Sequence, residues 1–254
     1  MDKNFDSLKE QFNQKVYSKG KGKLRISLIK HELEKLTLNK DRLNILDCGC
    51  GMGQIGIWLA QQGHKVTFCD ISPKMLNEAK ESAKNSKQSV DVDFIISSIQ
   101  NLPEKLKASN QYDLILLHGV IEWMQTPSHA IETVVKYVKK NGVISLLYFN
   151  KDKLILKWGI NGQTNEAISG KSHKNRPLTP MNPISLDEIK PHLAKHNLSI
   201  ISRSGIRIFY AFFKSTTEEL TDKHIQLELK HMKKEPFASL GEHTHILLQQ
   251  KSQT

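Results

Sequence analysis

The stretch that decides the fold is Leu43–Gly53, which reads Leu-Asn-Ile-Leu-Asp-Cys-Gly-Cys-Gly-Met-Gly. A short apolar run leads to Asp47, and glycine then occupies every second position. An apolar run bounded by glycines predicts a buried strand that enters a tight turn. After this turn apolar residues recur three and four apart, at Ile55, Trp58 and Leu59, which predicts a helix. Strand, glycine turn and helix are the first elements of α/β nucleotide-type sites.

Two acids indicate which ligand the turn favours. A dinucleotide fingerprint has a third glycine where this chain has Gln54. Asp47 would repel a pyrophosphate, but it suits the ammonium and sulfonium groups of S-adenosylmethionine. Asp70 ends the next apolar run, where an acid can accept both ribose hydroxyls. We therefore predict an S-adenosylmethionine site with Asp47, Gly51 and Asp70; the alternative is an ordinary αβ crossover with a solvated acid.

Length and cysteine usage set further bounds. With 254 residues the chain can form one α/β domain with an elaboration. Its three cysteines, Cys48, Cys50 and Cys69, cluster at positions that look buried, which indicates reduced thiols and a cytoplasmic protein. Cys48 and Cys50 have no further ligands nearby, so we expect no metal site. We also expect no signal peptide and no membrane segment, because no apolar stretch approaches spanning length.

The charge balance points to a partner. The formal net charge is +11 at pH 7. In an enzyme, such an excess favours a polyanionic partner through association rate and non-specific affinity. The alternative explanation for this positive charge is that the organism's proteins are rich in lysine in general.

The periodicity predicts strands alternating with helices. The expected strands after the first are 66–69, 92–96, 112–118, 143–149, 198–209 with a glycine kink at Gly205, and 245–249. The expected helices are 24–36, 73–86, one marked by Ile131 and Val138, 186–196 with a kink or an interruption at Pro191, and 217–234. This alternation predicts an α/β, Rossmann-like fold: a mostly parallel sheet with an antiparallel last strand and helices on both faces.

We expect two regions. Residues 1–40 form an amino-terminal helical cap, with a flexible basic link at 18–22, and residues 41–254 form the main domain. The pattern breaks at about 150–183, in an insertion too long for a simple connection. It carries six basic residues, Lys151, Lys153, Lys157, Lys171, Lys174 and Arg176.

The chemistry is expected at the carboxyl ends of the strands. The loop after the third strand should flank the adenine, with the backbone amide of Ile99 facing the ring. Ile71 and Met75 could sandwich the base or simply pack in the core. His118, Glu122 and Trp123 are positioning candidates where the methyl group meets its acceptor. A general base is only one option for His118, because transfer to an ionised oxygen needs in-line approach and desolvation but no proton removal.

Almost the whole chain resembles the tRNA 5-carboxymethoxyuridine methyltransferases, a family of class I S-adenosylmethionine-dependent methyltransferases that form the methyl ester of that wobble uridine. The glycine turn is common to the class. More specific are the stretches His-Gly-Val-Ile-Glu-Trp at 118–123, Gly-Ile-Arg-Ile-Phe at 205–209 and Glu-Pro-Phe-Ala-Ser-Leu-Gly at 235–241, with Asn-Phe-Asp at 4–6.

The resemblance implies cofactor contacts from Arg25, Gly49, Cys50, Asp70, Ile99, Gln100 and His118. Cys50 departs from the family, whose members can carry glycine there, and 159–171 matches poorly. The implied partner is the anticodon arm of a tRNA. The implied acceptor is a carboxylate, which is ionised at neutral pH and needs no base. Two alternatives remain: a methyltransferase for a small-molecule or carrier-bound carboxylate, and a non-catalytic tRNA-binding protein.

Overall fold

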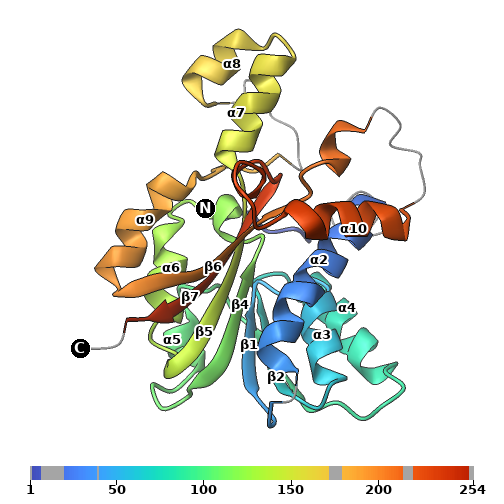
Figure 1. Cartoon of the computed structure of the whole chain (residues 1–254). Coiled ribbons are helices and arrows are strands. Elements are labelled where there is room, and N and C mark those ends of the chain that lie inside the picture. Colours follow the sequence, from blue (N-terminus) through green and yellow to red (C-terminus); the bar gives the residue numbers. More distant parts are fainter. Residues whose placement is uncertain (1, 7–19, 39, 172–178, 214–219, 252–254) are drawn as a thin grey trace.

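The computed structural model describes residues 2–6, 20–38, 40–171, 179–213 and 220–251. Its centre is one seven-stranded sheet with the strand order β3-β2-β1-β4-β5-β7-β6 (Figure 1). The first five strands run parallel, and β7 is antiparallel to both β5 and β6. The expected mostly parallel sheet with an antiparallel last strand is confirmed. The strands are β1 Asn44–Cys48, β2 Lys65–Asp70, β3 Val92–Ile96, β4 Tyr112–His118, β5 Val138–Phe149, β6 Leu198–Ile206 and β7 His243–Gln250.

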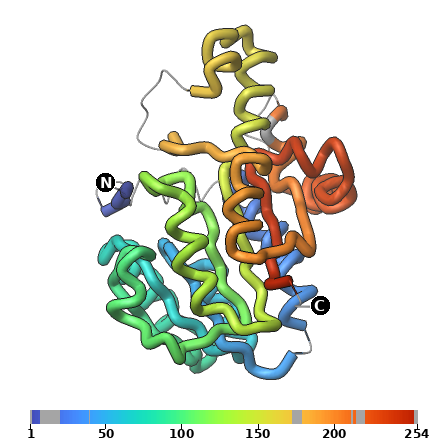
Figure 2. The backbone as a smooth tube through the Cα atoms, turned by 90° about the vertical axis from the view of Figure 1, so that its left-hand side faces the viewer, coloured from blue at the N-terminus to red at the C-terminus, as the bar shows by residue number. Residues whose placement is uncertain are grey.

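Helices cover both faces of the sheet. One face packs against α2 (Gly20–Thr37), α3 (Gln54–Ala60) and α4 (Pro73–Lys84), with α10 (Asp222–His231) against α2. The other face packs against α5 (Leu102–Lys105), α6 (Ser128–Val134) and α9 (Leu186–Lys195). Figure 2 turns the α6 and α9 side toward the reader. Central strands are nearly all apolar because they are buried on both faces.

The cap helix shares the core of the main domain. Leu24, Leu28 and Leu33 of α2 are fully buried in the same cluster as Ile45 of β1 and Leu116 of β4. The helix begins at Gly20, so the expectation of a flexible link through 18–22 is wrong for its last three residues. The apolar stripe that follows stabilises this first turn by burial, which outweighs the low helix propensity of glycine.

Two expected boundaries on the carboxyl side of the fold are also wrong. The helix marked by Ile131 ends at Val134, and Val138 already belongs to β5. Val138 pairs with Tyr112 through a register irregularity, because Gly142 passes close to the backbone of β4. The helix α9 is continuous through Pro191, so of the expected kink or interruption the interruption is wrong.

The last part of the chain is shorter in regular structure than expected. Strand β6 ends at Ile206 because Arg207 adopts a left-handed conformation with φ 63°. The irregularity in β6 lies between Ile200 and Ser202, not at Gly205. Short 3-10 helices follow at η3 (Tyr210–Phe212) and η4 (Phe237–Ser239), around α10. Residues 217–219 of the expected long helix lie outside the described residues.

The insertion after β5 contains two helices, α7 (Lys151–Ile160) and α8 (Thr164–Ser169). They project from the carboxyl end of β5, beyond the body of the sheet (Figure 1). Asn150 caps α7 by accepting from the amide of Asp152 at 3.1 Å. Among the described helices, none is long and apolar enough to cross a membrane.

Candidate active site

The glycine turn connects β1 to α3 at the carboxyl edge of the sheet. Gly49, Gly51 and Gly53 have φ values of 67°, 56° and 72°, in the left-handed region that side chains disfavour. A Cβ on Gly49 would come within 2.5 Å of Val120. The amides of Gly49 and Cys50 both donate to the carbonyl of Cys69, at 2.7 and 3.1 Å. The turn is therefore held against the end of β2 with its backbone open to a ligand.

Asp70 lies beside this turn and is held by backbone amides. Its Oδ2 accepts from Gly51 at 2.7 Å, and its Oδ1 accepts from Ser72 at 2.8 Å. The side chain is 9% exposed, and burial raises the pKa of its carboxyl above the usual range. Ser72 also caps α4 through Met75, as the Ser-Pro sequence predicts. Backbone amides thus position the carboxylate beside the pocket, and no salt bridge to Asp70 is found among the described residues.

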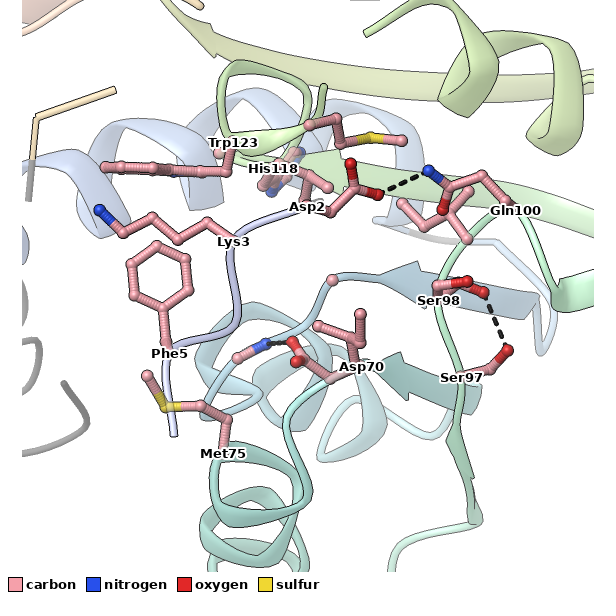
Figure 3. Close-up of a pocket in the computed structure, with 17 residues that line it drawn as sticks. Asp2, Lys3, Phe5, Asp70, Met75, Ser97, Ser98, Gln100, His118 and Trp123 are labelled. Carbon is pink, nitrogen blue, oxygen red and sulfur yellow. Dashed lines mark hydrogen bonds between the residues drawn. The ribbon is translucent and has the colours of Figure 1, made fainter. Parts of the chain in front are cut away.

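A single pocket joins these elements to the loops after β3 and β4 (Figure 3). Of the residues expected to contact the cofactor, the pocket is lined by Gly49, Gly51, Asp70, Ile99, Gln100 and His118. Ile71 and Met75 line it as well, as does the positioning candidate Trp123. The carboxyl ends of β1, β2 and β4 and the loop after β3 therefore meet at one place, as parallel strands require.

Three of the expected cofactor residues lie outside this lining. Asp47 is buried below the turn, where its carboxylate faces the backbone of Gly56. Burial, and secondarily the charge of Asp70, raise the pKa of Asp47 to about 7. Cys50 is buried, and Arg25 lies on α2, near enough for its charge to affect His118 and Glu122. Their contacts with a cofactor stay predictions.

The amino-terminal residues 2–6 cross the mouth of the pocket, an arrangement that the sequence pattern does not predict. Asp2 accepts from Gln100 Nε2 at 2.6 Å and from the amide of Gln125 at 2.8 Å. Phe5 packs edge-on against Trp123, with ring centroids 5.0 Å apart. The Asn-Phe-Asp stretch of the family resemblance is the available signal, but no periodicity connects it to the pocket.

Asp6 connects the amino-terminal residues 2–6 to the start of α4. Its carboxylate accepts from the Ser72 hydroxyl and from the amide of Lys74, the latter at 3.2 Å. The Ser72 hydroxyl bond in particular lowers the pKa of Asp6. Phe5, Asp2 and Lys3 line the pocket in Figure 3.

His118 lines the pocket, whereas the positioning candidate Glu122 is buried and is not among the lining residues. His118 Nε2 is 2.8 Å from Ser145 Oγ. Burial lowers the pKa of His118 well below its usual value, so the imidazole is neutral. Glu122 is 2% exposed, its Oε2 has no partner in the described part of the chain, and burial raises its pKa to about 7. His118 therefore offers a neutral imidazole, and Glu122 offers a carboxyl group that titrates near pH 7.

The cysteines are not arranged for metal binding. Cys48, Cys50 and Cys69 are free thiols and buried, and burial raises the pKa of each. In the described ranges no three His, Cys, Asp or Glu side chains gather as a set of metal ligands.

The geometry fits S-adenosylmethionine. The glycine turn leaves room for a ligand that approaches backbone, and a Cβ at Gly49 would require Val120 to move. The Asp70 carboxylate lies at the end of β2, where ribose hydroxyls can donate to it.

Residues 39–200 match the methyltransferase domain family. The chain belongs to this family. The match covers β1 to β5 and thus every strand whose end lines the pocket. The expected enzyme class is confirmed.

Relatives extend the comparison beyond this domain. The chain is 29% identical over 250 residues to the tRNA 5-carboxymethoxyuridine methyltransferase of Escherichia coli (strain K12), covering 96% of this chain and 95% of the relative. A ubiquinone biosynthesis O-methyltransferase of Rickettsia conorii is 33% identical, but over 129 residues, or 51% of this chain and 43% of the relative.

Solved structures share the fold. The magnesium protoporphyrin IX methyltransferase of Synechocystis PCC 6803, with bound SAH (S-adenosylhomocysteine), has a TM-score of 0.66 at 16% identity and covers 97% of this chain and 96% of its own. The plantazolicin methyltransferase BamL, also with SAH, has a TM-score of 0.60 at 16% identity and covers 95% and 89%. The class I methyltransferase fold is confirmed, and S-adenosylmethionine as the cofactor agrees with these comparisons.

Proposed function

We propose that this methyltransferase transfers a methyl group from S-adenosylmethionine to the carboxylate of 5-carboxymethoxyuridine at the wobble position of tRNA, and so forms the methyl ester. The observation that carries the proposal is the extent of the similarity to the E. coli tRNA 5-carboxymethoxyuridine methyltransferase, which covers 96% of the chain. The ubiquinone-pathway relative from R. conorii covers 51%. A tRNA substrate also implies that the protein acts in the cytoplasm.

The pocket supplies binding and orientation. Asp70 can accept the ribose hydroxyls, the amide of Ile99 can face the adenine, and the glycine turn can take the methionine part against backbone. When bound, S-adenosylmethionine supplies an electrophilic methyl group on a sulfonium. Phe5 and Trp123, which pack together at the pocket mouth, exclude water from the bound pair.

No residue need remove a proton from the acceptor. A carboxylate is ionised at neutral pH because its usual pKa is several units lower. His118, neutral because it is buried, therefore serves as a positioning group and not as a base. Alignment of donor and acceptor within the pocket then accounts for the rate increase.

The insertion offers fewer phosphate ligands than its six basic residues suggest. Lys153 is 3% exposed, and Lys151 is paired with Glu188 at 2.5 Å. Lys157 and Lys171 are exposed. Lys174 and Arg176 lie outside the described residues. We infer that Lys157 and Lys171 contribute to the tRNA platform beside the methyl-transfer site.

The decisive experiment uses tRNA from cells that make 5-carboxymethoxyuridine but lack its methyl ester. The purified protein is incubated with this tRNA and S-adenosylmethionine, and the nucleosides are measured by mass spectrometry. We expect the methyl ester to appear. A parallel reaction offers small-molecule and carrier-bound carboxylates. Turnover of those with none on tRNA would favour the small-molecule alternative, and no turnover at all would favour a non-catalytic binding protein.

A further inference from the structure

A series of buried polar side chains extends from His118 at the pocket across neighbouring strands of the sheet. His118 Nε2 lies 2.8 Å from Ser145 Oγ, and Ser145 Oγ lies 2.8 Å from His245 Nε2. Ser145 is fully buried and His245 is 1% exposed. The two imidazole rings are 5.9 Å apart and nearly perpendicular. The Ser145 hydroxyl on β5 therefore lies between the Nε2 atom of His118 on β4 and the Nε2 atom of His245 on β7.

This polar series lies on the largely apolar face of the sheet that packs against α2 and α3. Side chains two residues apart on a strand share a face. His118, Ser145 and Ser204 therefore lie on the face of Leu116, Leu147 and Ile206, which pack against α2 and α3. With His245 they make four polar side chains on neighbouring strands of this face. Burying them costs folding free energy unless each has a hydrogen-bond partner.

A buried carboxylate lies at the end of the polar series. Ser204 on β6 lies directly opposite His245 on β7 in the strand pairing. The Ser204 hydroxyl donates to Glu32 of α2 at 2.9 Å. Glu32 is 1% exposed and is held from the solvent side by Lys233 at 2.8 Å and Lys35 at 3.2 Å. Burial lowers the pKa of His245, the charge of Glu32 raises it, and the charge of Lys233 lowers it by less than Glu32 raises it. The charge that His245 experiences from this end is therefore mainly that of the Glu32 carboxylate.

Proton counting on Ser145 restricts the two histidines. A hydroxyl has one proton, so it can donate to one Nε2 and must accept from the other. The negative charge of Glu32 favours a proton on the His245 nitrogen that is not bound to Ser145. His245 Nε2 then accepts from the Ser145 hydroxyl, and Ser145 Oγ accepts from His118 Nε2–H. The His118 Nδ1 is left without a proton.

We propose that Ser145 and His245 are positioning residues that hold His118, which lines the pocket, as the neutral Nε2–H tautomer with an unprotonated Nδ1. A neutral imidazole adds no positive charge beside a cationic methyl donor. A ring held by a buried hydroxyl also has one orientation. The inference about catalysis rests on the proposed function, whereas the tautomer itself does not.

The tautomer is tested without cofactor or substrate. NMR of the 15N-histidine-labelled full chain distinguishes a protonated from an unprotonated ring nitrogen at His118. We expect protonated Nε2 and unprotonated Nδ1 in the parent. Ser145→Ala should give a mixture of tautomers, and Ser145→Thr, which keeps the hydroxyl, should restore the parent spectrum. Ser199→Ala, on β6 and away from Glu32 and the residues that contact it, is the matched control. A parent spectrum with protonated Nδ1 would overturn the proposal.

The second experiment measures the single-turnover rate of methyl transfer to tRNA. Misorientation of His118 in Ser145→Ala should slow this step by about 10- to 100-fold at saturating S-adenosylmethionine, with the rate recovered in Ser145→Thr. A parent that transfers no methyl group to tRNA would reject the proposed function and leave the NMR result to decide the tautomer. An active parent whose Ser145→Ala variant keeps both rate and spectrum would reject the positioning role.

Discussion

The amide of Gly51 donates to Oδ2 of Asp70 across 2.7 Å, so the glycine turn after β1 and the acid that ends β2 form one unit. The bond orients the carboxylate while leaving it next to the pocket. A ligand that engages Asp70 is therefore placed directly against the glycine turn. Changes at Asp70 should affect ligand binding more than any other single change in the turn.

Asp70→Ala should weaken S-adenosylmethionine binding by about 1.5–3 kcal/mol for each charge-assisted hydrogen bond removed, which is about tenfold or more in affinity. Isothermal titration calorimetry measures this directly. Asp93→Ala, which removes an exposed acid from β3, is the control. Thermal unfolding of both variants separates loss of the site from loss of the fold. Parent-like affinity in Asp70→Ala would remove this residue from the site.

The stability of the cofactor-free protein should fall as pH rises, in part through Asp47. Burial raises its folded-state pKa to about 7 from a usual 3.8, so the folded state holds the proton more tightly. That contribution is complete below about pH 4 and is lost as the pH rises through about 7. In urea unfolding between about pH 5 and pH 8, Asp47→Asn should lose less stability than the parent. Asp41→Asn, an exposed acid, should behave like the parent; equal pH slopes in all three proteins would contradict the assignment.

The single-turnover rate of methyl transfer should be flat from about pH 6 to 8, because the acceptor carboxylate is ionised throughout. His118 does not titrate in this range, since burial lowers its pKa well below the usual value. Glu122, with a pKa raised to about 7, is the group that could impose a slope. Any slope in the parent should therefore vanish in Glu122→Gln. A rise with a midpoint near about 7 that survives this change would indicate a general base.

Replacing Lys157 and Lys171 by Glu should weaken tRNA binding and flatten its dependence on salt, by about 0.7–0.9 in slope for each phosphate that is no longer neutralised. The cofactor affinity should not change, because neither residue lines the pocket. Fluorescence titration at several salt concentrations gives both quantities. The matched control is Lys107→Glu with Lys136→Glu, exposed lysines that precede β4 and β5 and so lie toward the amino ends of these strands. If both double variants lose the same affinity and slope, the insertion is not the platform.

Phe5→Ala should speed S-adenosylmethionine release, because the edge-on contact with Trp123 closes the pocket mouth. Such aromatic pairs contribute about 0.5–1.5 kcal/mol beyond buried area. Stopped-flow displacement measures the dissociation rate, with Phe212→Ala as an aromatic control outside the pocket. An unchanged dissociation rate would show that residues 2–6 do not retain the cofactor.

Much of the site was predictable because parallel strands bring their carboxyl ends to one edge. Apolar runs determined the strands from β1 to β5, and the residues that follow them, Asp70, Ile99 and His118, consequently meet in one pocket. The left-handed glycines after β1 were equally predictable, since a turn so tight excludes side chains. The local sequence pattern and the parallel arrangement of the strands are sufficient for these predictions, and side-chain packing need not be known.

Only the tertiary structure decided which charges and polar groups can act. The sequence treats the lysines of the insertion alike, whereas packing buries Lys153 and leaves Lys157 exposed. Likewise Ser145 and His245 are 100 residues apart and become partners only because β7 inserts antiparallel beside β5. Such pairings depend on strand register and burial, which are properties of the whole fold and leave no periodic trace along the chain.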